Sequence, residues 1–199
     1  MVSEPISRFP VPDRADLPAD LAERIAAVED KSGFVPNVFL ALAHRPAEWR
    51  AFFAYHDALM DAESALLGKA ERELIVVATS ALNHCLYCVV AHGAIARIRS
   101  RNPRLADQVA VDWRKAELTA AQRAMLEFAT RLAAEPWTVT EDEHLALAEH
   151  GFTRDDVWDI GSIVAFFAMS NRLVHLAAVP PNEEFYLLGR LPKPPAESG

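Results

Sequence analysis

The stretch from residue 72 to residue 92, RELIVVATSALNHCLYCVVAH, decides how this chain folds. Its apolar residues recur at helical spacing, which predicts helix on both sides of Asn83. In one continuous helix Glu73 would lie about 18 Å from Cys85, because twelve residues separate them along the axis. A helix N-cap at Asn83 would instead break the segment, let the first helix fold back and bring Glu73 to His92. The sequence leaves both arrangements open, and only the second one unites Glu73 with the cysteines.

Helical signals also run through the rest of the chain. Thr119 with Gln122, and Thr140 with Glu143, have the spacing of capping boxes, and Asp16 is a candidate N-cap for a first helix. No run of alternating apolar and polar residues predicts a strand. We therefore predict an all-α fold, a helical bundle.

The two ends of the chain differ in composition from its middle. Residues 1–15 are rich in proline and charge, which is typical of an extended arm. Residues 16–186 carry the helical patterns and are predicted to form one domain, and residues 187–199 form a proline-rich tail. With 199 residues, 51% of them hydrophobic, the chain is long and apolar enough to bury one sizeable core.

Charge and hydropathy exclude several classes of function. The formal net charge of −8 argues against nucleic acid as a partner, because phosphate binding needs clustered lysine and arginine. No glycine-rich phosphate loop supports nucleotide chemistry. The N-terminus has no signal-peptide pattern, and the strongly apolar window from Ile160 to Met169 is shorter than the ~20 residues of a membrane span. We expect no membrane partner and a cytoplasmic location.

Cys85 and Cys88 are the only cysteines of the chain, and they lie three residues apart. In a reducing cytoplasm such a pair is more often redox-active or metal-binding than a structural disulfide. On a helix both thiols and His92 lie near one face. The positive end of the helix dipole would favour thiolate, which is the form that reacts with a peroxide or a disulfide. His92 could accept the thiol proton, with Glu73 as its partner if the helix is broken.

Other interpretations of the same residues stay open. The thiols could be two inert buried groups, or they could switch the packing of a non-catalytic, redox-sensing interaction module. A zinc site could use Cys85, Cys88 and His92, together with His84, although structural zinc usually takes ligands from two separated elements. Tyr87 is most simply a packing residue, whose hydroxyl could also donate to a bound oxygen. We favour redox chemistry without haem, metal or another cofactor.

The segment from Trp158 to Phe167 has more apolar residues than one helix face needs. It could form a subunit interface, or it could be a buried core helix. The sequence does not distinguish these two environments.

The spacing of Glu73, Cys85, Cys88 and His92 resembles the motif of alkylhydroperoxidase D (AhpD), in the carboxymuconolactone decarboxylase-like superfamily. Further segments resemble a subgroup of peroxidase-related proteins, over roughly residues 30–180. They are Phe34-Val35-Pro36-Asn37, Ala43-His44-Arg45-Pro46, Arg72-Glu73-Leu74, Tyr87-Cys88 and Asn171-Arg172-Leu173.

The resemblance implies an AhpD-like helical fold that assembles as a homo-oligomer. It also implies a peroxidase that reduces hydroperoxides, in which Cys88 attacks the peroxide and Cys85 resolves the intermediate as a disulfide. His92 and Glu73 would form the proton relay. A dithiol or lipoyl-type donor would reduce the disulfide.

One position departs from the family pattern. The best-known members carry a histidine immediately before the second cysteine, where this chain has Tyr87. One relay group of the family is therefore missing or replaced.

Overall fold

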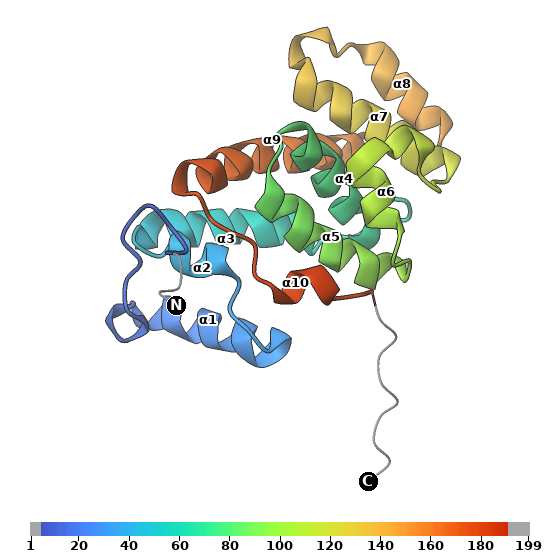
Figure 1. Ribbon diagram of the computed structural model, residues 1–199. Coiled ribbons are helices and arrows are strands. Elements are labelled where there is room, and N and C mark those ends of the chain that lie inside the picture. The colour runs from blue at the N-terminus through green and yellow to red at the C-terminus, as the bar shows by residue number, and fades with distance from the viewer. Residues whose placement is uncertain (1–4, 191–199) are drawn as a thin grey trace.

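The computed structural model describes residues 5–190, which contain helices and no strand. The all-α prediction is confirmed. The α-helices are α1 (Ala19–Ser32), α2 (Asn37–Ala41), α3 (Pro46–Met60), α4 (Lys69–Leu82), α5 (Leu86–Ser100), α6 (Leu105–Asp112), α7 (Ala120–Ala134), α8 (Glu141–Glu149), α9 (Arg154–Ala177) and α10 (Glu184–Leu187). Figure 1 shows α1 at one end of the molecule and the hairpin of α7 and α8 at the other.

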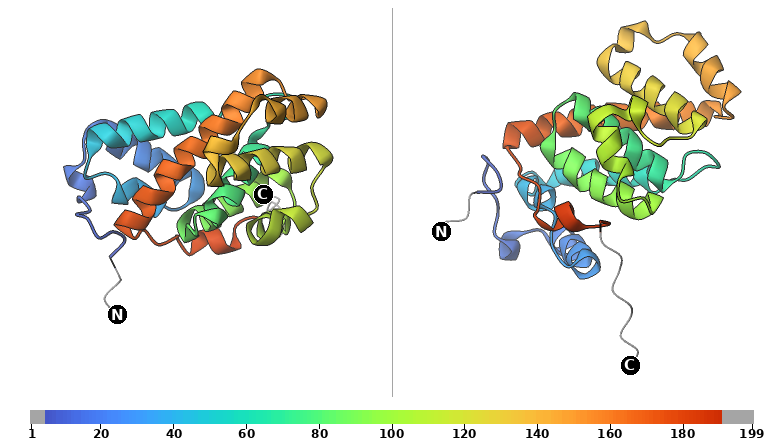
Figure 2. Two further views of the ribbon diagram at one scale, coloured as in Figure 1. Left: turned by 90° about the horizontal axis from the view of Figure 1, so that it is seen from above. Right: turned by 45° about the vertical axis from the view of Figure 1, so that its right-hand side comes forward.

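Helix α4 lies at the centre of the bundle, where it contacts α3, α5, α6, α7 and α9 (Figure 2). All residues from Arg72 to Ser80 are buried, including the apolar run from Leu74 to Ala78. A helix that is apolar on nearly all sides is stable only when neighbours cover it completely. The central position of α4 therefore follows from its sequence, and it forces the two charged residues Arg72 and Glu73 into the interior.

The chain reverses direction between α4 and α5, so residues 72–92 form two helices and not one continuous helix. The N–H of His84 donates to the Ala81 carbonyl at 3.0 Å, and the N–H of Cys85 donates to the Ser80 carbonyl at 2.9 Å. With His84 in the left-handed region at φ 53°, these two bonds form a Schellman motif. Cys85 then becomes the N-cap of α5.

Two predicted N-caps are wrong. Asn83 is the C-cap of α4, because its amide group bonds to α9 instead of to the first turn of α5. Asp16 lies in a short 3-10 turn, and α1 begins at Ala19 with Pro18 as its N-cap. Leu17 cannot join the helix, since the residue before a proline is driven to extended backbone, here at ψ 145°.

The capping boxes predicted at α7 and α8 are confirmed, and the structure adds another one at α9. Thr119 pairs with Gln122, and Thr140 pairs with Glu143. At α9 the same reciprocal arrangement joins Thr153 and Asp156. In each box, side chains accept hydrogen bonds from backbone N–H groups at the start of the helix, where no preceding helical turn supplies an acceptor.

Parts of the predicted arm and tail pack against the helical domain. The N–H of Arg8 donates to the Ala177 carbonyl at 2.8 Å, at the end of α9. The buried guanidinium of Arg97 donates to the carbonyls of Leu188 and Phe185, at 2.9 and 2.8 Å. Residues 1–4 of the arm and 191–199 of the tail lie outside the described residues.

Half of the residues from Trp158 to Phe167 are buried in the core. Ile160, Ile163 and Phe166 are buried, whereas the Trp158 side chain is 76% exposed. By length and composition α9 could cross a membrane, and half of its most apolar window is buried inside the fold. The core interpretation therefore holds for the buried side of α9.

Candidate redox site

The turn between α4 and α5 brings Glu73 and His92 into direct contact. Glu73 lies in the first half of α4 and His92 in the second turn of α5. The Glu73 Oε2 atom is 2.7 Å from His92 Nδ1, and both side chains are almost fully buried. A carboxylate in this position holds the proton on Nδ1, which leaves Nε2 as the nitrogen that can take up and release a proton.

Phe167 on α9 fixes the ring of His92 from a second side. The two rings meet edge to face with their centroids 4.7 Å apart. The imidazole is therefore held by one polar and one apolar contact, from two different helices.

Both cysteines are free thiols that are almost fully buried, with exposed fractions of 0% for Cys85 and 2% for Cys88. Cys85 caps α5, and Cys88 lies in its first turn, one turn before His92. Cys85, Cys88 and His92 therefore follow one another along the start of α5, as predicted from the sequence, although the helix begins later than Asn83. The site residues Glu73, Cys85, Cys88 and His92 come from two adjacent helices.

The environment lowers the pKa of Cys85 to about 7. A hydrogen bond from the Cys88 thiol is the main cause, and burial opposes it. The backbone N–H of Cys88 and positive charge on His175 and His92 act in the same direction as the thiol. The reduced pair thus carries its negative charge on the sulfur at the helix N-terminus.

The pKa of Cys88 is raised well above its ordinary value. The hydrogen bond to Cys85 is the main cause, followed by burial and the negative charge on Cys85. Hydrogen bonds from the side chains of Asn171 and Ser170 lower it. The two sulfurs therefore share one proton, which rests on Cys88.

Sequence reasoning missed the polar residues that α9 contributes. Asn171 stood out only as part of a segment that resembles relatives, and Ser170 did not stand out at all. Both are buried beside Cys88. The available signal was a pair of polar residues within the apolar helical pattern of α9.

Tyr87 is a packing residue, as predicted. It is buried with Phe34 and Phe185, and its hydroxyl accepts a hydrogen bond from the Val38 N–H at 3.4 Å. Burial raises the pKa of Tyr87, so the phenol stays protonated. The side chain at this position is therefore a buried, neutral phenol.

A second histidine lies next to His92. The ring centroid of His56, on α3, is 6.3 Å from that of His92, and His56 Nδ1 is 3.1 Å from an oxygen of Asp57. The helical pattern of α3 gave no reason to expect His56 at the site. It lies between His92 and the partly exposed Asp57.

The described residues give no support to the zinc alternative. Within residues 5–190, no group of three or more histidine, cysteine, aspartate or glutamate side chains is arranged to hold a metal ion. His84 is exposed in the turn before Cys85, whereas the two thiols are buried.

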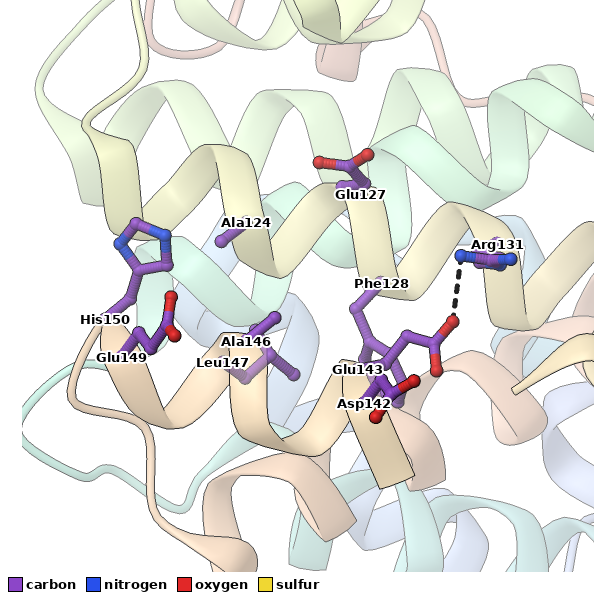
Figure 3. A pocket seen from close by; sticks show the side chains of 10 residues that line it. All are labelled: Ala124, Glu127, Phe128, Arg131, Asp142, Glu143, Ala146, Leu147, Glu149 and His150. Carbon is purple, nitrogen blue, oxygen red and sulfur yellow. Dashed lines mark ion pairs between the residues drawn. The ribbon is translucent and has the colours of Figure 1, made fainter. Parts of the chain in front are cut away.

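An open groove of about 350 Å³ lies elsewhere, between α7 and α8 (Figure 3). Phe128 and Leu147 line its apolar part, and an ion pair joins Arg131 to Glu143 across it at 2.8 Å. The groove contains none of the site residues from α4 and α5. The groove is therefore separate from the buried cysteines.

Comparison with known proteins agrees with this architecture. The model of the carboxymuconolactone decarboxylase family matches residues 46–131. No curated protein matches the chain.

Solved structures match over nearly the whole chain. The AhpD core of a peroxidase-related protein from Ralstonia eutropha JMP134 is 59% identical, with a TM-score of 0.94 over 96% of this chain and 100% of that chain. A peroxidase-related protein from Silicibacter sp. TM1040 is 37% identical, with a TM-score of 0.88 over 96% of this chain and 100% of that chain. The debrominase Bmp8, in complex with 2,3,4-tribromopyrrole, is 20% identical, with a TM-score of 0.72 over 90% of this chain and 95% of that chain. This last likeness concerns the fold alone.

Proposed function

Because the chain belongs to the AhpD-like proteins of the carboxymuconolactone decarboxylase superfamily, we propose that it is a thiol-dependent peroxidase. It reduces hydroperoxides through a disulfide between Cys85 and Cys88. The observation that carries the proposal is the buried pair of Glu73 and His92, joined at 2.7 Å one helical turn beyond Cys88. A dithiol next to a fixed proton-exchanging group has the components that peroxide reduction requires.

The first step is attack of the Cys88 sulfur on the distal oxygen of the hydroperoxide. An S–O bond forms as the O–O bond breaks, and the thiol proton passes through His92 to the leaving alkoxide. The products are an alcohol and a sulfenic acid on Cys88. Glu73 stabilises the positive charge that His92 carries in between.

The second step is attack of the Cys85 thiolate on the sulfenic sulfur. The S–S bond forms, and hydroxide leaves as water with a proton that His92 takes up from solvent. A dithiol, such as a lipoyl-type group, then reduces the disulfide by thiol–disulfide exchange and restores both thiols.

Family resemblance and local electrostatics point to different sulfurs as the attacking group. The resemblance assigns the attack to Cys88, whereas the resting negative charge lies on Cys85. We retain Cys88 because it is one turn from His92, which can remove its proton during the attack. The Cys85 thiolate is then ready to resolve the sulfenic acid without a further deprotonation.

Hydroperoxide consumption with dihydrolipoamide as the reductant tests the proposal. We expect turnover by the unmodified protein, and loss of turnover in both Cys88→Ser and Cys85→Ser. Only Cys85→Ser should still form one sulfenic acid per chain, which a dimedone-type probe detects. His84→Asn, in the exposed turn beside the pair, is the matched control and should keep full activity.

Unchanged peroxide consumption in Cys88→Ser would rule out the assignment. Oxidation that changes assembly without any turnover would instead favour the redox-sensing module. Sulfenic acid in Cys88→Ser, and none in Cys85→Ser, would exchange the roles of the two cysteines.

The proposal extends to assembly and location. We expect a homo-oligomer, with Trp158, Met169 and Leu176 on the exposed side of α9 as the first surface to test for self-association. The mass in solution measures this directly. We expect the protein to act in the cytoplasm, where dithiol reductants keep the pair reduced.

A further inference from the structure

Asn171 is a buried amide that two hydrogen bonds hold in one orientation. It is 1% exposed in the second half of α9. Its Oδ1 atom accepts from the Asn83 amide at 2.9 Å, and its Nδ2 atom donates to Ser80 Oγ at 3.0 Å. Both partners belong to the C-terminal end of α4, immediately before the cysteines.

The surroundings of Asn83 make this arrangement rigid. The Asn83 carbonyl accepts a hydrogen bond from His175 Nε2, one turn after Asn171 on α9, at 3.0 Å. The Ser80 carbonyl accepts the N–H of Cys85 in the Schellman motif. The position of the Asn171 amide is therefore coupled to the turn that places the thiols.

A side-chain amide has two N–H donors, and Ser80 takes one of them. Buried donors are almost always satisfied. Val174, one turn after Asn171 on α9, packs in one buried cluster with Cys88. The second N–H of Asn171 therefore has the Cys88 sulfur as its nearest acceptor, in agreement with the effect of Asn171 on the pKa of that thiol. A hydrogen bond to an anionic acceptor is about twice as strong as one between neutral groups. The hydrogen bond from the second N–H to the Cys88 sulfur is therefore strongest when that sulfur carries negative charge.

We propose that Asn171 stabilises negative charge on the Cys88 sulfur during the reaction. This inference rests on the proposed function, because it concerns the sulfur that attacks the peroxide. The amide is neutral and fixed, so it assists the anion but does not exchange the proton. His92 keeps that second task.

Other titratable groups near Cys88 also affect its ionisation. Cys85, Tyr87 and His92 lie on its own helix or at the helix cap, His175 lies on α9, and Glu73 on α4 is paired with His92. Replacing Cys85 by serine removes the thiolate whose hydrogen bond, above all, and whose negative charge raise the pKa of Cys88. The contribution of Asn171 is therefore measured best in the Cys85→Ser background.

The experiment is the pH dependence of Cys88 alkylation by iodoacetamide in that background. Asn171→Leu has nearly the same size and no donor. We expect alkylation at pH 7 to slow about tenfold or more, and the profile to move to higher pH, because a hydrogen bond to a charged group is lost. Arg172→Ala is the matched control, since the exposed side chain of Arg172 hydrogen-bonds within α9, to the Ala168 carbonyl.

A second variant keeps the test decisive if Asn171→Leu does not fold. Asn83→Ala, at a half-buried position, removes one of the two bonds that orient the amide. It should slow alkylation about threefold. A folded Asn171→Leu protein with an unchanged profile would overturn the inference, and so would an unchanged Asn83→Ala if the first variant is unfolded.

Alkylation does not require peroxidase activity, so the two proposals can fail separately. A protein without peroxide turnover but with a shifted profile in Asn171→Leu would reject the proposed peroxidase and retain the role of Asn171 at the sulfur. Normal turnover with an unshifted profile would do the reverse.

Discussion

Two polar clusters begin at adjacent residues of α4, Arg72 and Glu73. They differ in whether their members can exchange protons. The Arg72 guanidinium donates to the carbonyls of Leu59 and Leu67 and to the Asp159 carboxylate, at 2.6, 3.3 and 2.6 Å. It joins α4 to α9 and to the end of α3 through fixed donors. The Glu73 cluster also joins helices, but its members are groups that gain and lose protons.

The difference separates a structural charge from a reactive one. Arginine stays protonated at every accessible pH, so its cluster can only hold helices together. The second cluster contains an imidazole and two thiols that share a proton near neutral pH. Burial alone therefore does not mark a functional site, whereas burial of exchangeable protons does.

Glu73→Gln should have the largest effect on activity. Glutamine can still accept the His92 proton in a hydrogen bond but cannot stabilise the imidazolium, so we expect peroxide turnover to fall about 100-fold or more. The melting temperature should change little. Steady-state kinetics and thermal unfolding measure the two quantities, and full activity in this variant would remove Glu73 from the relay.

Arg72→Met should show the opposite pattern. It leaves the Leu59 and Leu67 carbonyls and the Asp159 carboxylate without their partner, so the free energy of unfolding should fall by about 3–5 kcal/mol. Turnover per folded molecule should stay the same. Urea unfolding of this variant beside Asp159→Asn, which keeps an acceptor oxygen, provides the control. A stable but inactive Arg72→Met protein would contradict the distinction between the clusters.

The reactivity of Cys85 should follow a pKa of about 7. Alkylation of the reduced protein should slow about tenfold for each pH unit below 7 and level off above it. Since folding lowers this pKa from 9.0, the contribution of Cys85 to stability is full above pH 9 and is lost as the pH falls through 7. Cys88→Ala removes the thiol donor and should move the alkylation profile towards pH 9; an unmoved profile would mean that the helix N-terminus alone sets the pKa.

Tyr87→Phe should have the smallest effect. The hydroxyl accepts one long hydrogen bond from Val38, so its loss should cost about 0.5–1.5 kcal/mol of stability. Turnover should stay within about twofold of the parent. A large loss of turnover in a stable Tyr87→Phe protein would show that the phenol takes part in the chemistry after all.

Local patterns predicted the helices and several of their ends. The capping boxes at Thr119 and Thr140 depend on residues three apart in the chain, so they can be found without knowledge of the fold. Asn83 shows the limit of such signals. An asparagine side chain can cap the start of a helix or hydrogen-bond to another helix, and here Asn83 bonds to Asn171 on α9.

By itself, the sequence determined an all-helical chain, an apolar helix around residues 74–78, and two cysteines that lie two turns and one turn before a histidine. These properties depend on spacing within a few turns of one helix. Only the tertiary structure decided that Glu73 meets His92, that Asn171 lies beside Cys88, and that Tyr87 packs against Phe185. Those contacts join residues from 19 positions apart, for Glu73 and His92, to 98 positions apart, for Tyr87 and Phe185. They exist because the buried faces of α4, α5 and α9 must pack together.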